Sequence, residues 1–402
     1  MGITLGRSMV AFGAVCIGVV ILHAYRLKLV DDEVALAHEQ LKETLLGLET
    51  TRPVLHGEPI EGFAFDHYKL IGSLLSPTVV DDRLAWLNAD GAQADELRDA
   101  SLDSNRLALE ALELGARSTD SLYKLDWSSP PPVEHPKLGS TRSIVNLALL
   151  SGQRHLDEGH PDRAVDALLD GLQLGRDVIC IPAWITEMIG TSLIPIVTEA
   201  LANEEFLERF PPHQLERLAN GLQQLDESLP EFSHGIEGEL LMLANLARQE
   251  NQPDDVHVFD PTLEFWRYGF SPRALYAEYI SQVMRDREVL RGLEGEPWSV
   301  RDAELGRQQL TAEGARDSLS SGSSAKLTRI QEGNRRMTIS RLRLAQAAVR
   351  FKLTGEVPTL LDPFGGELRV RKLAGKIQIE SGCTADFGAP EQFVVELTLR
   401  EE

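Results

Sequence analysis

The chain has 402 residues, of which 43% are hydrophobic but only 6% aromatic, with a net charge of -22 and an isoelectric point of about 4.9. This length is enough for two or three domains, and the dominance of leucine and alanine favours helices over a β-sandwich or barrel. So acidic a surface repels phosphate backbones, which argues against general nucleic-acid binding and against broad electrostatic docking on anionic lipid.

The first predicted element is an apolar segment from Ser8 to Tyr25. Its eighteen residues include no Asp, Glu, Lys or Arg. As a helix they span roughly 27 Å, about the thickness of a hydrocarbon core. We therefore predict an uncleaved single-pass transmembrane anchor over residues 1–29. Two alternatives stay open: a cleaved secretory signal, for which Leu22–Ala24 is a poor cleavage site, and a buried core helix.

The side of the membrane is less clearly encoded in the residues that flank this segment. Basic residues on its two sides nearly balance, whereas an acidic triplet at 31–33 and a short N-terminal tail favour a body outside the cytoplasm. Val15 precedes Cys16 where a lipoprotein signal needs a small residue, so lipidation is disfavoured. We predict a protein of the bacterial inner membrane with a periplasmic body.

Composition predicts four further regions after the anchor. Residues 30–127 contain an acidic stalk helix and a first helical region. Residues 128–136 (SSPPPVEHP) form a linker, because three consecutive prolines exclude a helix and favour an extended spacer. Residues 137–320 are predicted to be an irregular, repeat-like helical body, in which Pro195 kinks or divides one helix. Residues 325–402 are predicted to be a long basic helix followed by a small sheet.

A helical hairpin is predicted over residues 138–179. Gly152, Gly159 and Ala164 are small residues that let two antiparallel helices approach closely, and His160–Asp162 supplies the turn. Residues 145–176 thereby resemble a single tetratricopeptide repeat. One repeat cannot bury its own apolar face, so the resemblance implies that neighbouring helices complete the core.

After Gly355 the sequence pattern changes from one typical of helices to one typical of strands. The segments LRVRK, KIQIE and FVVELTL are rich in β-branched residues, and the first two alternate with period two. They predict a small antiparallel sheet that packs on the preceding helix. The predicted fold class is therefore mainly α, with an N-terminal transmembrane helix, a repeat-like helical body and a small C-terminal antiparallel sheet on a long helix.

The same tail contains two short motifs, one at the end of the long helix and one just before the sheet. The long helix ends near Gly355–Pro358, and Asp362–Gly365 (DPFG) then turns the chain into the sheet. This order resembles the C-terminal domain of type II secretion major pseudopilins and the tails of other membrane-anchored helical bacterial proteins. That family's calcium loop is not matched, since Asp386 is the single candidate ligand in SGCTADFGAPEQ, and the N-terminus contains no prepilin-type cleavage motif.

Two groups of polar residues are weak catalytic candidates. Glu231 and His234 have the Glu-x-x-His spacing that carboxylate-bridged metal sites use on a helix, although no second copy occurs. Asp66 and His67, with Glu61 and His56 nearby, form an acid–base or metal-binding pattern. The alternative in both cases is an ordinary solvated polar face, so an enzyme is possible but not favoured.

Cysteine usage and motifs limit the chemistry further. Cys16, Cys180 and Cys383 are too few for a disulfide framework or a four-ligand zinc site. A disulfide between Cys180 and Cys383 and two separate thiols both stay open. Walker, GxGxxG, GxSxG and HExxH motifs do not occur in the sequence, so neither a cofactor nor a metal is expected.

The most unusual feature is a basic helix in an acidic chain. Six of its residues are the predicted binding residues: Lys326, Arg329, Arg335, Arg336, Arg341 and Arg343. Arg350 and Lys352 extend the same region, and Glu332 is its one acid. This helix is predicted either to dock on the acidic body of its own chain or to meet an acidic partner or the membrane surface.

These observations predict a membrane-anchored scaffold or protein-interaction protein of the bacterial cell envelope. By the resemblance of its tail, it would be associated with a secretion or pilus-like assembly. We expect protein partners and a membrane contact through residues 8–25, but no nucleic acid. The alternative is a hydrolase or metal-dependent enzyme with a site between helical regions.

Overall fold

The computed structural model describes residues 52–76, 92–121, 139–232, 298–314, 321–383 and 393–399, and scattered positions within 28–40, 235–238 and 288–296. Contacts divide the chain into two compact units, and nearly all described residues belong to the unit that comprises 49–124, 134–236 and 290–402. The predicted anchor at 8–25, the linker at 128–136, His234 and Asp386 lie outside the described residues. No helix in the described part is both long and apolar enough to span a membrane.

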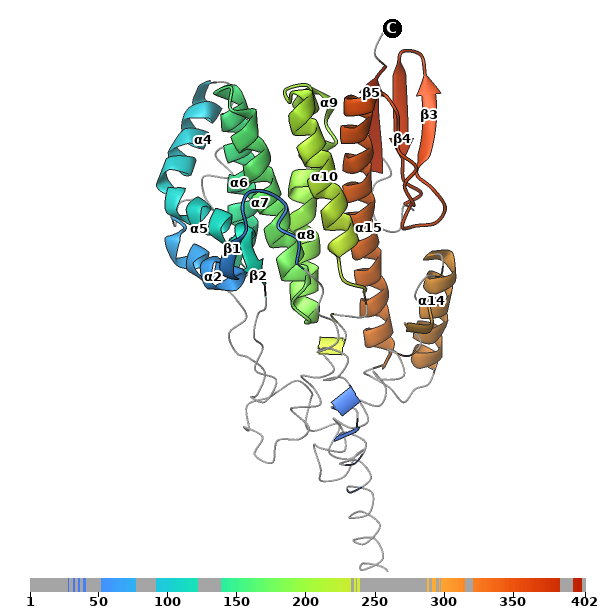
Figure 1. The fold of residues 1–402 in the computed structure, drawn as a ribbon. Coiled ribbons are helices and arrows are strands. Elements are labelled where there is room, and N and C mark those ends of the chain that lie inside the picture. Colours follow the sequence, from blue (N-terminus) through green and yellow to red (C-terminus); the bar gives the residue numbers. More distant parts are fainter. Residues whose placement is uncertain are drawn as a thin grey trace, which may run out of the picture. The chain divides into compact units, whose positions relative to one another are not determined.

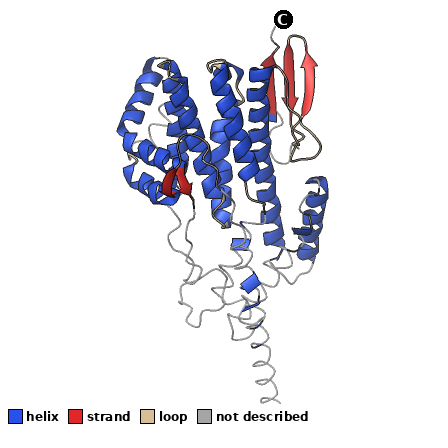
Figure 2. Ribbon diagram, in the orientation of Figure 1, coloured by secondary structure: helices blue, strands red, loops and turns tan. Residues whose placement is uncertain are grey.

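This unit is mainly helical, with one small antiparallel sheet near the C-terminus (Figure 1, Figure 2). Its described helices are α2 (Ala64–Leu74), α4 (Ala92–Ser104), α5 (Arg106–Arg117), α6 (Gly139–Asp157), α7 (Pro161–Ile179), α8 (Trp184–Leu201), α9 (Glu204–Leu207), α10 (Pro212–Ser228), α14 (Trp298–Gly314) and α15 (Ser321–Thr354). Its strands are β1 (Ile60–Phe63), β2 (Ser118–Asp120), β3 (Arg369–Leu373), β4 (Lys376–Glu380) and β5 (Val394–Thr398). The predicted mainly helical class with a small C-terminal sheet is confirmed.

Helix α7 is the central helix of the unit. Helices α5, α6, α8 and α10 all pack against it, and every residue from Leu168 to Ile179 is buried. A helix surrounded in this way is normally apolar on all sides. Helix α7 instead has a row of polar side chains spaced three or four residues apart, namely Asp166, Asp170, Gln173 and Asp177. That spacing places them on one face of the helix, and the extended segment from Arg52 to Pro59 meets this face.

Arg52 fastens the extended segment to the rest of the unit. Its guanidinium lies 2.6 Å from the Asp177 carboxylate, and the two side chains are 3% and 0% exposed. It also donates to the carbonyl oxygens of Gly115 (3.0 Å) and Ala116 (3.1 Å) in the last turn of α5. Tyr68 of α2 donates its hydroxyl to Asp177 at 3.1 Å, and burial raises the pKa of Tyr68, which keeps that donor protonated. One buried ion pair therefore joins α2, α5 and α7.

Helices α6 and α7 form the predicted antiparallel hairpin. A side chain on Gly152 would press on Leu168, 3.3 Å away, and on the carbonyl oxygen of Ala164, 3.4 Å away. Gly159 turns the chain with a φ of 76°, and Pro161 occupies the first turn of α7, where its missing N–H is not needed. The predicted close approach at Gly152 and Ala164 is confirmed.

Helix α8 passes through Pro195 without being divided. Proline has no N–H to donate to the carbonyl oxygen of Thr191 one turn earlier, and the sequence therefore predicted a kink or a break there. Thr338 of α15 replaces the missing donor, because its hydroxyl donates to that carbonyl oxygen at 2.9 Å. The Thr191 carbonyl oxygen, which Pro195 leaves without a backbone donor, is thus satisfied by the neighbouring helix α15.

The C-terminal sheet has the antiparallel order β3-β4-β5. Strands β4 and β5 bury alternate residues, which are Ile377, Ile379, Val395 and Leu397. Gly375, with a φ of 72°, makes the turn between β3 and β4. The alternation of apolar and polar residues predicted these strands because one face of β4 and β5 packs on helix α15 and the other face is exposed to water.

The first helical region also contains two short strands that were not predicted: β1 pairs in parallel with β2. Gly62 has a φ of 145°, and Arg117 donates to the carbonyl oxygen of Glu58 at 3.2 Å, beside the start of β1. Strands of three and four residues are too short to show an alternating pattern, so they could not be predicted from the residues.

Replacing Arg52 with methionine tests the ion pair that joins α2, α5 and α7. Arg52→Met leaves the buried Asp177 carboxylate with Arg176, 3.2 Å away, as its one cationic partner among the described residues, so we expect a loss of about 3 kcal/mol in the free energy of unfolding. Adding Asp177→Leu removes the carboxylate that Arg52 and Arg176 share, so the double variant should lose less than the sum of the two single variants. Urea-induced unfolding of the full chain, followed by circular dichroism, measures each value.

Arg106 provides the matched control for this experiment. It also pairs with an acid, Glu110 at 2.7 Å, but its side chain is 73% exposed. Such exposed pairs stabilise proteins little, so Arg106→Met should change stability by less than about 0.5 kcal/mol. Equal effects of Arg52→Met and Arg106→Met would contradict a central role for Arg52.

Candidate functional site

Three of the four weak catalytic candidates, Asp66, His67 and Glu231, lie in the described part of the chain, where Asp66 and His67 come from a different segment than Glu231. Asp66 and His67 lie on α2, which packs against α5 and α6. Glu231 follows the end of α10, which packs against α7 and α15, and it is not helical, so the expected Glu-x-x-His geometry on a helix is not formed at its first residue. Within the described residues, no hydrogen bond or ion pair joins Asp66 or His67 to Glu231. His234 lies outside those residues.

His56 has different partners from those that the sequence suggested. Its Nε2 lies 2.5 Å from Asp170 Oδ1 and its Nδ1 lies 3.4 Å from Asp166 Oδ1. Burial opposes protonation of the imidazole, but hydrogen bonds and charges from both carboxylates outweigh it and raise the pKa of His56 to about 10. An imidazolium that stays charged to this pH is no general base near neutrality. It binds the extended segment to α7 instead.

The described part of the chain offers little support for a metal site or for a reactive thiol. No group of three or more His, Cys, Asp and Glu side chains that could hold a metal ion occurs there. Cys180 and Cys383 are both thiols rather than a disulfide. Burial raises the pKa of each thiol to about 11, so neither is a reactive thiolate at neutral pH.

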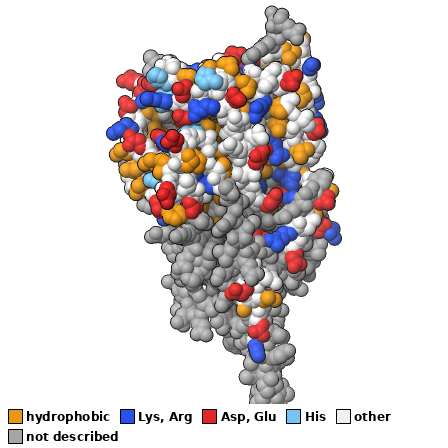
Figure 3. Space-filling model, viewed as in Figure 1, with side chains coloured by type: hydrophobic (Ala, Val, Ile, Leu, Met, Phe, Trp, Pro, Cys, Tyr) orange, Lys and Arg blue, Asp and Glu red, His pale blue; other side chains and the backbone are white. Residues whose placement is uncertain are grey.

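The arginines predicted to bind a partner lie on α15 and contact acids of their own unit. The pairs are Arg329–Asp302 (2.5 Å), Arg335–Glu187 (2.6 Å), Arg336–Glu332 (2.7 Å), Arg341–Glu199 (3.1 Å) and Arg343–Asp226 (2.9 Å). The side chain of Lys326 is outside the described residues. Acidic and basic side chains are likewise interspersed over the face drawn in Figure 3. These contacts agree with the intramolecular alternative, and a role in binding a partner stays a prediction.

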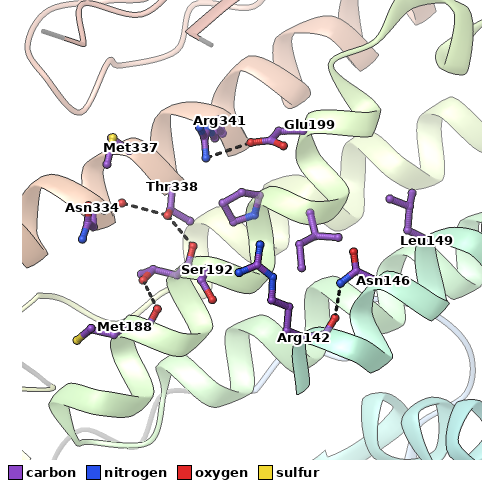
Figure 4. Close-up of a pocket in the computed structure, with 13 residues that line it drawn as sticks. Arg142, Asn146, Leu149, Met188, Ser192, Glu199, Asn334, Met337, Thr338 and Arg341 are labelled. Carbon is purple, nitrogen blue, oxygen red and sulfur yellow. Dashed lines mark hydrogen bonds and ion pairs between the residues drawn. The ribbon is translucent and has the colours of Figure 1, made fainter. Parts of the chain in front are cut away.

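A cavity of about 450 Å³ lies between α6, α8 and α15 (Figure 4). Its apolar lining consists of Leu149, Met188, Pro195, Ile196 and Met337. Its uncharged polar lining consists of Asn146, Thr191, Ser192, Asn334 and Thr338. The hydrogen bond from Thr338 to the Thr191 carbonyl crosses from α15 to α8 in this lining, so the cavity adjoins the turn that Pro195 disturbs.

Three charged residues complete the lining. Arg341 is paired with Glu199, and its guanidinium also lies 5.2 Å from the centre of the Phe393 ring. Arg142, on α6, is exposed and points its guanidinium into the cavity (Figure 4). In the described part of the chain this guanidinium has no hydrogen-bond or ion-pair partner. Among the described residues, the cavity therefore has one positive charge without an ion-pair partner, in a chain with a net charge of -22.

Sequence reasoning missed this cavity. Arg341 was singled out as part of the basic helix, and Pro195 as a helix breaker, but Arg142 and the two methionines carry no local signal. Residues from three helices line the cavity, and their approach depends on tertiary packing that no spacing in the sequence reveals.

Comparisons with known proteins give no further guidance: no family model, no curated protein and no solved structure matches the chain.

The raised pKa of His56 predicts a pH-dependent stability. A folded-state pKa of about 10, against an ordinary value of 6.5, contributes stability that is complete below pH 6.5 and is lost as pH rises toward 10. The difference in unfolding free energy between the native chain and His56→Gln should therefore be largest near pH 6 and smallest near pH 10. Urea unfolding at several pH values measures it.

His155 is the control for the pH experiment. Burial lowers the pKa of His155, so this residue is neutral in both the folded and unfolded states above about pH 7. The effect of His155→Gln should accordingly be constant from pH 7 to pH 10. A constant effect of His56→Gln over the same range would show that its charge does not stabilise the fold.

Proposed function

We propose that this chain is a protein-interaction module in which the cavity between α6, α8 and α15 receives a short segment of a partner protein. The observation on which this proposal rests is the exposed guanidinium of Arg142, which has no ion-pair partner among the described residues and points into a cavity with a mixed apolar and polar lining. A segment that places an apolar side chain in the cavity and a carboxylate beside Arg142 fits this arrangement.

The size and the lining of the cavity support binding of a segment. About 450 Å³ is within the range of ligand pockets and accommodates a few side chains. Met188, which is 48% exposed, and Met337 lie on opposite helices of the cavity. Methionine side chains are flexible and polarisable, so they adapt to apolar groups of different shapes.

The lining supports binding more than catalysis. Among the described residues that line the cavity there is no histidine or cysteine, and Glu199 is the one acid. Glu199 is engaged by Arg341 at 3.1 Å, which leaves little capacity for proton transfer. The rival proposal of a hydrolase or metal-dependent enzyme has no comparable group of residues in its favour.

We further propose that the module is held at the bacterial inner membrane by residues 8–25, with its body in the periplasm. The support is the uncharged eighteen-residue segment and the acidic triplet that follows it. The likeness of the tail to major pseudopilins favours a partner in an envelope assembly, by analogy alone.

A photo-crosslinking residue at Ser192 tests the cavity. Ser192 is exposed and its hydroxyl donates to the Ile189 carbonyl oxygen at 2.7 Å; Ser73 on α2 is its match, exposed and donating to the Leu70 carbonyl oxygen at the same distance. We expect p-benzoylphenylalanine at Ser192, in the full chain in its native membrane, to give an adduct of discrete mass. Position Ser73 should not give it. Denaturing gel electrophoresis and mass spectrometry detect the product.

Charge reversal at Arg142 provides the second readout. Arg142→Glu should reduce the Ser192 adduct about tenfold, because a carboxylate on the partner would then meet another carboxylate. Arg106→Glu, at an exposed position on α5, should leave the adduct unchanged. The proposal fails if Ser192 gives no adduct, if both positions give the same products, or if Arg142→Glu has no effect.

Protease treatment of intact spheroplasts tests the placement. We expect the body to be digested without lysis and the chain to resist extraction by alkaline carbonate, since a transmembrane helix is not released by high pH. A variant that lacks residues 2–29 should be extracted. A body that survives in intact spheroplasts, and is digested only after lysis, is cytoplasmic and contradicts the proposed orientation.

A further inference from the structure

Among the described residues, strand β3 is an edge strand of the C-terminal sheet. In the order β3-β4-β5 it is bonded to β4 on one side, and it is the strand farthest from α15 in Figure 1. All five of its residues are exposed, whereas β4 and β5 bury alternate residues. An edge strand of this kind has backbone N–H and C=O groups directed away from its sheet, which is the template that strand addition requires.

Both faces of β3 are open as well as its edge. Val370 and Lys372 pair with Ile379 and Ile377, so they share the face on which β4 buries its apolar residues. Val370 is nevertheless 46% exposed, which means that β3 extends beyond the helix that covers β4. An added strand would therefore gain mainly backbone hydrogen bonds and contacts with the side chains of β3 itself.

Those side chains have a strong charge preference. Arg369, Arg371 and Lys372 are three cations in five residues. Arg371 has an acidic neighbour on β4, Glu380 at 3.2 Å, but the Arg371 side chain is still 59% exposed. A strand with carboxylates that face Arg369 and Arg371 would complement this edge, and a basic strand would not.

A second copy of the chain is a poor occupant. Antiparallel pairing of two β3 strands about their centre places Arg371 opposite Arg371, and like charges directly opposite each other are unfavourable. Basic residues on an edge are a known protection against such self-association. The same charges that exclude a second copy select an acidic strand.

We propose that β3 binds an extended acidic segment of a partner protein, which adds to the sheet as a fourth strand. Carboxylates on alternate residues of that segment would face Arg369 and Arg371 on one face of the sheet, and the intervening residues would lie beside Val370 and Lys372 on the other face. The backbone hydrogen bonds fix the register, and the charges choose the partner. This site does not depend on the cavity between α6, α8 and α15, because the two share no residue.

The test uses the full chain and a fluorescent eight-residue peptide of alternating glutamate and valine. Fluorescence anisotropy should show saturable binding, and amide hydrogen exchange should slow in residues 369–373. A peptide of alternating lysine and valine should not bind. A glutamate–valine peptide that is N-methylated on alternate residues keeps its charges but cannot complete the ladder, so it should bind about tenfold more weakly.

Charge reversal on the protein completes the design. Arg371→Glu with Lys372→Glu should weaken binding about tenfold, whereas Arg106→Glu with Arg163→Glu, at exposed positions on α5 and α7, should not. Thermal melting confirms that each variant is folded. Absence of saturable binding overturns the proposal. Equal binding of the N-methylated peptide, or binding without slower exchange in β3, also overturns it, because attraction of charges alone would then explain the result.

Discussion

The ion pair between Arg52 and Asp177 is the interaction on which the rest of the described unit depends. Removing two charges from water is costly, and the cost is offset when geometry is good and the remaining hydrogen-bonding capacity is used. Arg52 meets this condition, because its guanidinium binds the carboxylate and also the carbonyl oxygens at the end of α5. Asp177 meets it through Arg52 and Tyr68. Arg52 and Tyr68 are 125 and 109 residues away from Asp177 in the sequence, and these contacts hold their segments on α7.

This arrangement also explains why the most buried helix is not the most apolar one. A purely apolar face on α7 would accept the segment at 52–59 in several registers, because apolar contact is not directional. Arg52 at Asp177 and His56 between Asp166 and Asp170 fix the register at two points. The polar row on α7 therefore provides specificity in addition to stability, a role best attested where a buried polar group sets the register between helices.

Local features of the fold could be predicted from the sequence, whereas features built from distant residues could not. Period two located β3, β4 and β5, and the small residues at Gly152 and Ala164 located the α6–α7 hairpin, because each signal is contained within about thirty residues. His56 was noticed, but its partner Asp170 lies 114 residues away. Pro195 was noticed as a helix breaker, but its compensation by Thr338 comes from another helix. The cavity has the same origin, since three helices contribute its lining.

The distribution of charge shows how a dense basic segment can be compensated within its own unit. The arginines of α15 face acids on α8, on α10, on α14 and within α15 itself, and these pairs join parts of one unit. A cation that is readily available to a partner lies instead where its own chain offers little compensation. Arg142 meets this condition with no ion-pair partner in the described part of the chain, and β3 meets it with three exposed cations on an edge strand. In an acidic protein, the local compensation of a cation is therefore more informative about binding than the number of cations around it.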